Sequence, residues 1–283
     1  MSNDVVRTEL FKEINSLSLD RLELKKVLVI LQAKATEACK LECDFIDTTN
    51  ETKETVDRAK ENAKKCAIIK VTIKGYNGED LFGSIDEVFN PDIFPERVKT
   101  LFVSSDTTYI AWYNHHPRNS FQLFIDFTKP KVFDFSIQPS DKTPNDSNFK
   151  VIGFDSTWVH GVFSEFDKVF LNRNLKFIHK SSTYNILVWL IGIPFSFWAC
   201  FRLSPIINKY FDSNTFLSNA FFVYIYIMCF FAIRILFHYS RWIYPMVEFK
   251  NKNDRAVLHR AALYTITIGM FGKFLYDILK WFF

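Results

Sequence analysis

Residues 216–245 read FLSNAFFVYIYIMCFFAIRILFHYSRWIYP, and this stretch determines how the rest of the chain is interpreted. No charged side chain occurs from Ser213 to Ile233. At about 1.5 Å per residue, a helix over these 21 residues is roughly 31 Å long, which matches the hydrocarbon core of a bilayer. The composition therefore predicts a membrane-spanning helix over about 215–237.

A second uncharged run of the same length precedes it, from Ser181 to Phe201, and predicts a span over about 184–203. Gly192 and Pro194 lie inside this run and are expected to kink the helix, because proline removes a backbone donor. A buried helix of a soluble core is the alternative. Two such runs close together favour the membrane.

Arg234 is embedded in apolar sequence, so it either acts inside the bilayer or marks its edge. A helix that begins near Thr215 places Arg234 roughly 28 Å along its axis, where the guanidinium group can reach water. Arg241 and Trp242 follow shortly afterwards, and basic and aromatic residues are typical of a membrane interface. We therefore predict that Arg234, Arg241 and Trp242 are interface anchors, with a buried functional charge at Arg234 as the alternative.

The C-terminal tail allows two interpretations. It is predicted to form a third span over about 257–281, although its uncharged core, Ala261–Gly272, has only twelve residues. Lys273 and Asp277 are four residues apart, so on a helix they share a face and can form a charge pair. The alternative is an amphipathic helix that lies in the interface.

The distribution of basic residues predicts the orientation, because positive charge is retained on the cytoplasmic side. The loop between the two spans holds only Arg202 and Lys209. The outer flanks are richer in basic residues: Lys168, Arg173, Lys176 and Lys180 before the first span, and Arg241, Lys250, Lys252, Arg255 and Arg260 after the second. Residues 1–180 and 241–260 are therefore expected in the cytoplasm. The polar start, MSNDVVRTEL, does not resemble a signal peptide. The prediction is an integral membrane protein, of the inner (plasma) membrane in a bacterium.

The predicted fold is an α+β cytoplasmic domain followed by an α-helical transmembrane module of two to three spans. Residues 1–65 are expected to form an N-terminal helical arm, 66–180 an antiparallel sheet domain with a linking helix, and 181–283 the membrane module. Apolar residues of the arm fit a heptad that Glu42 breaks, so packing against the chain's own domain is favoured over a coiled coil. These residues are Leu24, Leu28, Leu31, Ala35, Ala38 and Phe45.

In the sheet domain, CAIIKVTIKG (66–75) alternates apolar and polar residues, and Asn77-Gly78 predicts a two-residue hairpin turn. Further strands are predicted over 98–105, 107–114, 120–127, 131–136 and 148–154. Short connections between these runs predict antiparallel pairing. Apolar residues return to helical spacing over about 156–172.

No phosphate-binding, dinucleotide-binding, zinc-protease or serine-hydrolase motif occurs, so no catalytic residue, cofactor or metal is predicted. The best polar cluster is His115 and His116 with Arg118, which can bind an anionic ligand or help to ligate a metal, although a solvated hairpin tip is favoured. Tyr109 and Trp112 are added as aromatic candidates for a ligand-binding surface. Cys39 and Cys43, one helical turn apart, have no histidine pair nearby, so a metal or redox role is not favoured.

A net charge of +4 does not indicate nucleic-acid binding. Five scattered cysteines argue against a disulfide framework. We therefore expect a non-enzymatic membrane protein whose cytoplasmic domain recognises a small ligand, a protein partner or its own copies in a homo-oligomer, and transmits this to the spans. This architecture is similar to that of membrane-acting effectors of bacterial antiviral defence, by analogy alone. The alternatives are a channel or transporter subunit regulated by its cytoplasmic domain, and a membrane-tethered enzyme.

Overall fold

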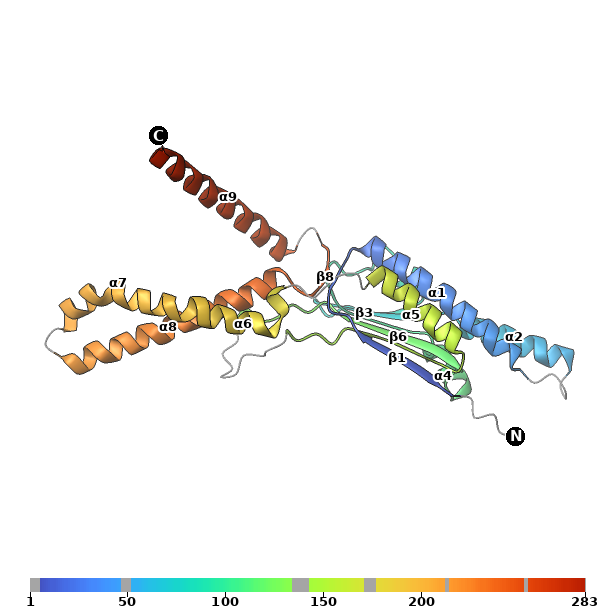
Figure 1. Ribbon diagram of the computed structural model, residues 1–283. Coiled ribbons are helices and arrows are strands. Elements are labelled where there is room, and N and C mark those ends of the chain that lie inside the picture. The colour runs from blue at the N-terminus through green and yellow to red at the C-terminus, as the bar shows by residue number, and fades with distance from the viewer. Residues whose placement is uncertain are drawn as a thin grey trace. The chain divides into compact units, whose positions relative to one another are not determined.

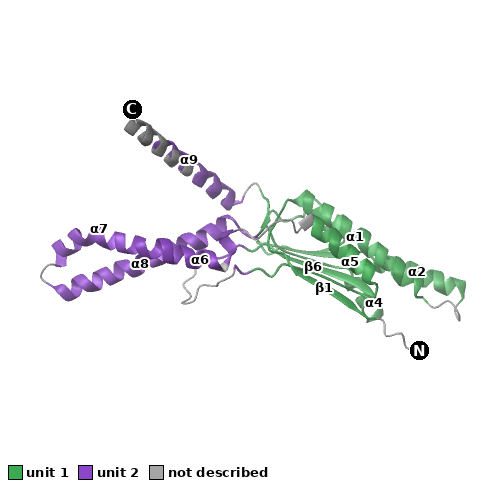
Figure 2. Cartoon of the chain, viewed as in Figure 1, with its two compact units in different colours: residues 1–128, 145–174, 247–251 green, residues 129–144, 175–246, 252–283 purple. Residues whose placement is uncertain are grey.

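The computed structural model describes residues 6–46, 52–133, 143–170, 177–211, 214–251 and 254–282. The chain forms two compact units (Figure 2). Unit 1 comprises residues 1–128, 145–174 and 247–251, and unit 2 comprises residues 129–144, 175–246 and 252–283. Unit 1 is an α+β structure and unit 2 is helical (Figure 1).

A six-stranded antiparallel sheet forms the centre of unit 1, with strand order β1-β7-β6-β5-β3-β4. A separate two-stranded parallel ladder joins β2 to β8. The strands are β1 (Thr8–Glu13), β2 (Leu17–Leu19), β3 (Lys70–Gly75), β4 (Asp80–Gly83), β5 (Val98–Ser104), β6 (Asn119–Asp126), β7 (Asn148–Gly153) and β8 (Val247–Phe249). The predicted α+β fold with an antiparallel sheet is therefore confirmed.

The helices of unit 1 are α1 (Arg21–Asp44), α2 (Lys53–Cys66), α3 (Ile85–Val88), α4 (Thr107–Tyr113) and α5 (Ser156–Phe170). Helices α1 and α5 lie on the same face of the sheet (Figure 1). Phe149 of β7 stacks on Phe166 of α5, with 3.7 Å between ring centroids, and is fully buried. Five of the six predicted heptad residues are also buried within unit 1, because that face of α1 packs on its own domain: Leu24, Leu28, Leu31, Ala35 and Ala38. The sixth, Phe45, follows the end of α1 and is 62% exposed.

A hairpin turn joins β3 and β4 where it was predicted, but it has three residues, 76–78, rather than two, because the Gly75 N–H donates to the Glu79 carbonyl oxygen at 2.8 Å. Gly78 has a φ of +90°, which glycine adopts at low cost because it lacks a Cβ atom. The register pairs Lys74 with Asp80 across the turn. A local signal in two residues was sufficient to predict this connection.

Two stretches differ from the prediction. Residues 107–113 form helix α4 rather than a strand, and Asn114 ends the helix with a left-handed φ of 54°. Asp106 stands at the N-cap position, but its side chain makes no capping hydrogen bond. Residues 8–19 form β1 and β2 rather than helix, because they pair with distant segments, Thr8 with Gly153 and Leu17 with Val247. In the predicted strand 131–136, residues 131–133 form no strand, and the rest lies outside the described residues.

Unit 2 contains α6 (Ser181–Leu187), a π-helical turn (Val188–Gly192), α7 (Ile193–Phe211), α8 (Thr215–Ile243) and α9 (Arg255–Phe282). Helices α7 and α8 lie side by side (Figure 1). Gly192 allows the π-helical turn to approach α8 closely, since a Cβ atom on Gly192 would lie 3.4 Å from Ile233 Cδ1. The π-helical turn directly precedes Pro194, whose missing N–H group leaves a carbonyl of the preceding turn without its usual donor.

Two helical stretches, Ser182–Phe211 and Thr215–Ile243, are long and apolar enough to cross a membrane. They coincide with the two predicted spans and extend beyond both of them toward the C-terminus. Helix α9 covers the predicted third span as one continuous helix. Whether any of the three crosses a bilayer stays a prediction.

Candidate ligand-binding site

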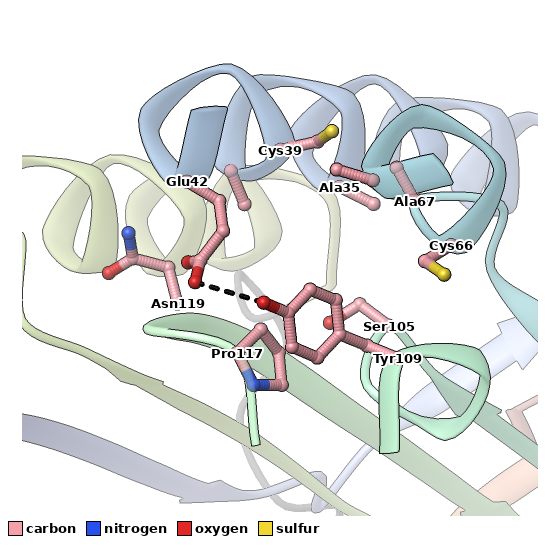
Figure 3. A pocket seen from close by; sticks show the side chains of 11 residues that line it. Ala35, Cys39, Glu42, Cys66, Ala67, Ser105, Tyr109, Pro117 and Asn119 are labelled. Atoms are coloured by element: carbon pink, nitrogen blue, oxygen red, sulfur yellow. Dashed lines mark hydrogen bonds between the residues drawn. The ribbon is translucent and has the colours of Figure 1, made fainter. Parts of the chain in front are cut away.

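A hollow in unit 1 lies between α1, α2, α4 and the residues at the start of β6 (Figure 3). Its empty volume is about 350 Å³, part of which is open to solvent. Small side chains on α1 and at the end of α2 leave this space between the helices. The lining residues are Ala35, Ala38, Cys39, Glu42, Ala63, Cys66, Ala67, Ser105, Tyr109, Pro117 and Asn119.

Glu42 is the principal charged group of the hollow and connects three elements. Its Oε1 atom accepts a hydrogen bond from the Tyr109 hydroxyl group at 3.3 Å, drawn as a dashed line in Figure 3. Its Oε2 atom accepts from the Arg118 backbone N–H at 3.0 Å. The residue that interrupts the apolar heptad therefore holds the end of α1 against α4 and the start of β6.

Tyr109 is kept in its protonated form by its surroundings. Burial raises the pKa of the Tyr109 hydroxyl, and the charge of Glu42 and its hydrogen bond raise it further. Its ring also lies near those of Tyr113 and His115, with centroid distances of 4.7 Å and 5.3 Å. Tyr109 is therefore a hydrogen-bond donor at neutral pH, fixed in place by its neighbours.

The thiol groups near the hollow are also held neutral. Burial, followed by the neighbouring Cys43, raises the pKa of Cys39 from 9.0 to about 12. Burial likewise raises the pKa of Cys66, which is only 1% exposed. A neutral thiol is a poor nucleophile and a poor metal ligand. Within the described ranges, no three His, Cys, Asp or Glu side chains are placed to hold a metal ion.

The two histidines lie between α4 and β6 and have different partners. His115 Nδ1 is 3.0 Å from the Tyr113 carbonyl oxygen. His116 Nδ1 is 3.4 Å from Oδ2 of Asp106, a buried carboxylate that also accepts hydrogen bonds from Ser104 Oγ and from Gln122 Nε2. One nitrogen of the His116 ring therefore contacts a buried carboxylate, while the side chain is 66% exposed.

Arg118 contributes to this site through its backbone and its side chain. Its guanidinium carbon lies 3.8 Å from the ring centroid of Phe45 and 5.3 Å from that of Phe154. Such stacking is stabilising and leaves the planar guanidinium donors available at the edge of the group. A cation held on aromatic rings is suited to an anionic or polar ligand.

Of the five predicted ligand-binding residues, Tyr109 alone is among the residues that line the hollow. His115 contacts the Tyr109 ring, and the Arg118 backbone N–H donates to Glu42, so these two adjoin it. His116 contacts Asp106 instead, and Trp112 is 57% exposed on α4. Sequence reasoning missed the roles of Glu42 and Asp106. The signal for Glu42 was present, because an acidic residue at an otherwise apolar heptad position indicates a polar partner. Ligand binding by these residues stays a prediction.

The remaining predicted residues are in unit 2. Arg234 and Arg241 of α8 are buried, with 9% and 1% exposure, and Trp242 is half-buried. Arg241 Nε donates to the Ile178 carbonyl oxygen at 3.2 Å, and its guanidinium group lies over the Phe237 ring at 4.2 Å. That Arg234, Arg241 and Trp242 anchor the helix at a membrane interface stays a prediction. Lys273 is exposed on α9, and the side chain of Asp277 lies outside the described residues.

The fold and the site define a class: a chain with an N-terminal α+β region, whose sheet is antiparallel, followed by two long apolar helices. No protein-family model, curated protein or solved structure matches the chain.

Proposed function

We propose that this chain is a non-enzymatic integral membrane protein in which the α+β unit recognises a ligand or further copies of the chain and transmits that event to the membrane helices. The observation that carries the proposal is the exposure of the two apolar helices. Only 11% and 6% of the residues in their most apolar stretches are buried within the protein. In a core helix of a soluble protein, most of the apolar residues are buried.

Water is an unfavourable surrounding for these helices. Trp189, Phe197, Phe201 and Phe216 are each at least 63% exposed. Covering a large apolar side chain is worth about 1.5–3 kcal/mol, so a surface of this kind in water strongly favours association or insertion. Lipid covers such a surface and leaves the backbone hydrogen bonds of the helices intact.

The hollow beside Glu42 supports recognition as the task of unit 1. It combines an acidic group, a hydroxyl donor and neutral thiols with a histidine and a stacked arginine nearby. Sites that bind small ligands are concave and hold a few placed polar groups, as this one does. The neutral state of Cys39 and Cys66 favours binding over nucleophilic chemistry.

Fractionation of cells that express the full chain tests membrane insertion. We expect the protein in the membrane fraction after alkaline carbonate and urea washes, with release only by detergent. Release by carbonate alone would contradict insertion. Dye leakage or depolarisation on overexpression tests the effector version, and a membrane that stays intact at high expression would rule that version out.

A further inference from the structure

The sheet of unit 1 has a second face, opposite the helices α1 and α5, that carries phenylalanines. Antiparallel sheets often expose one face, which is then polar. Here Phe82, Phe11 and Phe102 are 64%, 57% and 37% exposed. We call the side of the sheet that bears these residues and Phe124 the Phe face.

The strand register places these residues relative to one another. Phe102 of β5 pairs directly with Phe124 of β6, at the centre of the six strands. Phe82 of the edge strand β4 and Phe102 both pair with Thr72 of β3, so three of the phenylalanines occupy one row across the sheet. Phe102 and Phe124 therefore form the middle of the Phe face, and Phe82 of β4 and Phe11 of β1 lie on its two edge strands.

Charged residues flank this row and balance one another. Lys74 lies 3.6 Å from Asp80, and Lys150 lies 2.8 Å from Glu9. The lysines of this face in the described strands are Lys70, Lys74 and Lys150, and the carboxylates are Glu9, Glu13, Asp80 and Asp126. Carboxylates slightly outnumber lysines, so the Phe face does not attract anionic lipid or nucleic acid.

We infer that the Phe face is the surface through which two copies of this chain associate, packed face to face about a two-fold axis. A two-fold interface sets each surface against an identical one, so a strongly charged face would repel itself. Lys74 and Lys150, two of the three lysines of the Phe face, are paired with carboxylates of the same face, which limits this repulsion. Aromatic residues are enriched at the core of protein–protein interfaces.

The Phe face is large enough for a stable interface between two copies. With strands about 4.8 Å apart and about 3.3 Å per residue, six strands of roughly six residues cover about 600 Å². Two copies then bury roughly 1,200 Å², at the lower bound of stable, specific interfaces. Two sheets packed in this way lie about 10 Å apart, which large side chains such as phenylalanine fill.

The test uses the full chain in detergent and measures its mass by light scattering over a range of concentrations. We expect a dimer for the wild-type chain. For Phe102→Glu and Phe82→Glu, we expect the dissociation constant of the dimer to be at least about a hundredfold higher, because each substitution would bury a charge against an apolar surface. Val29→Glu is the matched control. Val29 is 53% exposed on α1, and its substitution should leave the dimer intact.

Cross-linking keeps the test decisive if a phenylalanine variant fails to fold. A two-fold axis that overlaps the whole face passes near its centre, where Gln122 of the central strand β6 is half-buried in the row next to Phe102 and Phe124. Gln122→Cys should give a cross-linked dimer with a bismaleimide of about 10 Å, above the background of the wild-type cysteines, and Val29→Cys should not.

A monomeric wild-type chain would overturn the inference. So would a dimer that persists in both glutamate variants while Gln122→Cys gives no cross-link, since the copies would then meet elsewhere. The inference deepens the proposed function by naming one surface for recognition of further copies. The dimer inference and the proposed membrane insertion can fail separately. Carbonate extraction measures insertion into the membrane, and loss of the dimer does not change its result.

Discussion

Tyr109 and Glu42 are joined by a hydrogen bond of 3.3 Å between the tyrosine hydroxyl group and Oε1 of the carboxylate. The contact links residues 67 positions apart in the sequence. Because the second carboxylate oxygen accepts from the Arg118 N–H, one side chain fixes both helix α4 and the start of β6. The shape of the hollow depends on this link.

Removal of the link should cost a measurable part of the stability of unit 1. Tyr109→Phe deletes only the hydroxyl group and should lower the free energy of unfolding by about 1 kcal/mol. Glu42→Ala also leaves the Arg118 N–H without its acceptor, so its cost should be higher, about 1–3 kcal/mol. Urea titration of the full chain in detergent, followed by far-UV circular dichroism, measures both.

The double variant tests whether the two residues act together. If they are coupled, the combined cost of Tyr109→Phe and Glu42→Ala falls below the sum of the single costs by roughly 1 kcal/mol. Strictly additive costs would show that the contact contributes nothing. Trp112→Phe, an exposed change on the same helix, is the control and should be neutral.

Cys39 should react slowly with alkylating agents in the folded chain. Raising its pKa from 9.0 to about 12 reduces the thiolate fraction at pH 8 by about a thousandfold. We expect iodoacetamide labelling of Cys39, resolved by peptide mass spectrometry, to be slower than in the urea-denatured chain by at least about a hundredfold. Equal rates in the two states would contradict the raised pKa.

The same shift predicts the pH dependence of stability at high pH. Above pH 9.0 the unfolded Cys39 thiol loses its proton, whereas the folded thiol keeps it until about pH 12. The folded state therefore holds more protons in this window, and stability falls as the pH rises. Cys39→Ser should flatten this part of the stability profile, and an unchanged slope would mean that other groups control it.

The sequence predicted best those features that short segments determine. Asn77-Gly78 specifies its turn because glycine is needed at φ +90°, and the two apolar runs specify long helices by length and composition alone. The strands at residues 8–19 were missed because their partners are far along the chain, β7 for β1 and β8 for β2. Pairing over such distances leaves little local trace.

The site was predicted only as far as its local cluster. His115, His116 and Arg118 are neighbours in sequence, so their proximity required no fold. Glu42 and Asp106 enter through the packing of α1 and the position of α4, and α4 itself was predicted as a strand because its aromatic residues favour strands. Asn114, which ends α4 in the left-handed conformation, was the better signal.

Two glycines in or near α5 should respond in opposite ways to alanine. A Cβ atom at Gly153 would collide with Asn119 Oδ1 and lie 2.8 Å from Val159 Cγ2. Asn119 accepts hydrogen bonds from the N–H groups of Phe154 and Asp155 at 3.1 Å and 3.2 Å, so its displacement breaks both. Gly153→Ala should destabilise unit 1 by about 2–3 kcal/mol.

Gly161→Ala is the matched control within α5. Nothing lies within 4 Å of a Cβ atom at this position, and alanine favours the helical backbone more than glycine does. The variant should be more stable than the wild-type chain by about 0.5–1 kcal/mol in the same urea titration. Destabilisation by Gly161→Ala would show that the surroundings of α5 are more crowded than the structure indicates.

The proposed orientation in the membrane predicts which residues are reached from outside the cell. The connection between the first two spans carries few basic residues, whereas both outer flanks are rich in them, so the connection should be external. Asn208→Cys, at an exposed position near the end of α7, should react with a membrane-impermeant maleimide in intact cells. Val29→Cys on α1 should react only after the membrane is permeabilised, and labelling of the wild-type chain gives the background from the natural cysteines. The reverse pattern would place unit 1 outside the cell and remove recognition of an intracellular ligand from the proposed function.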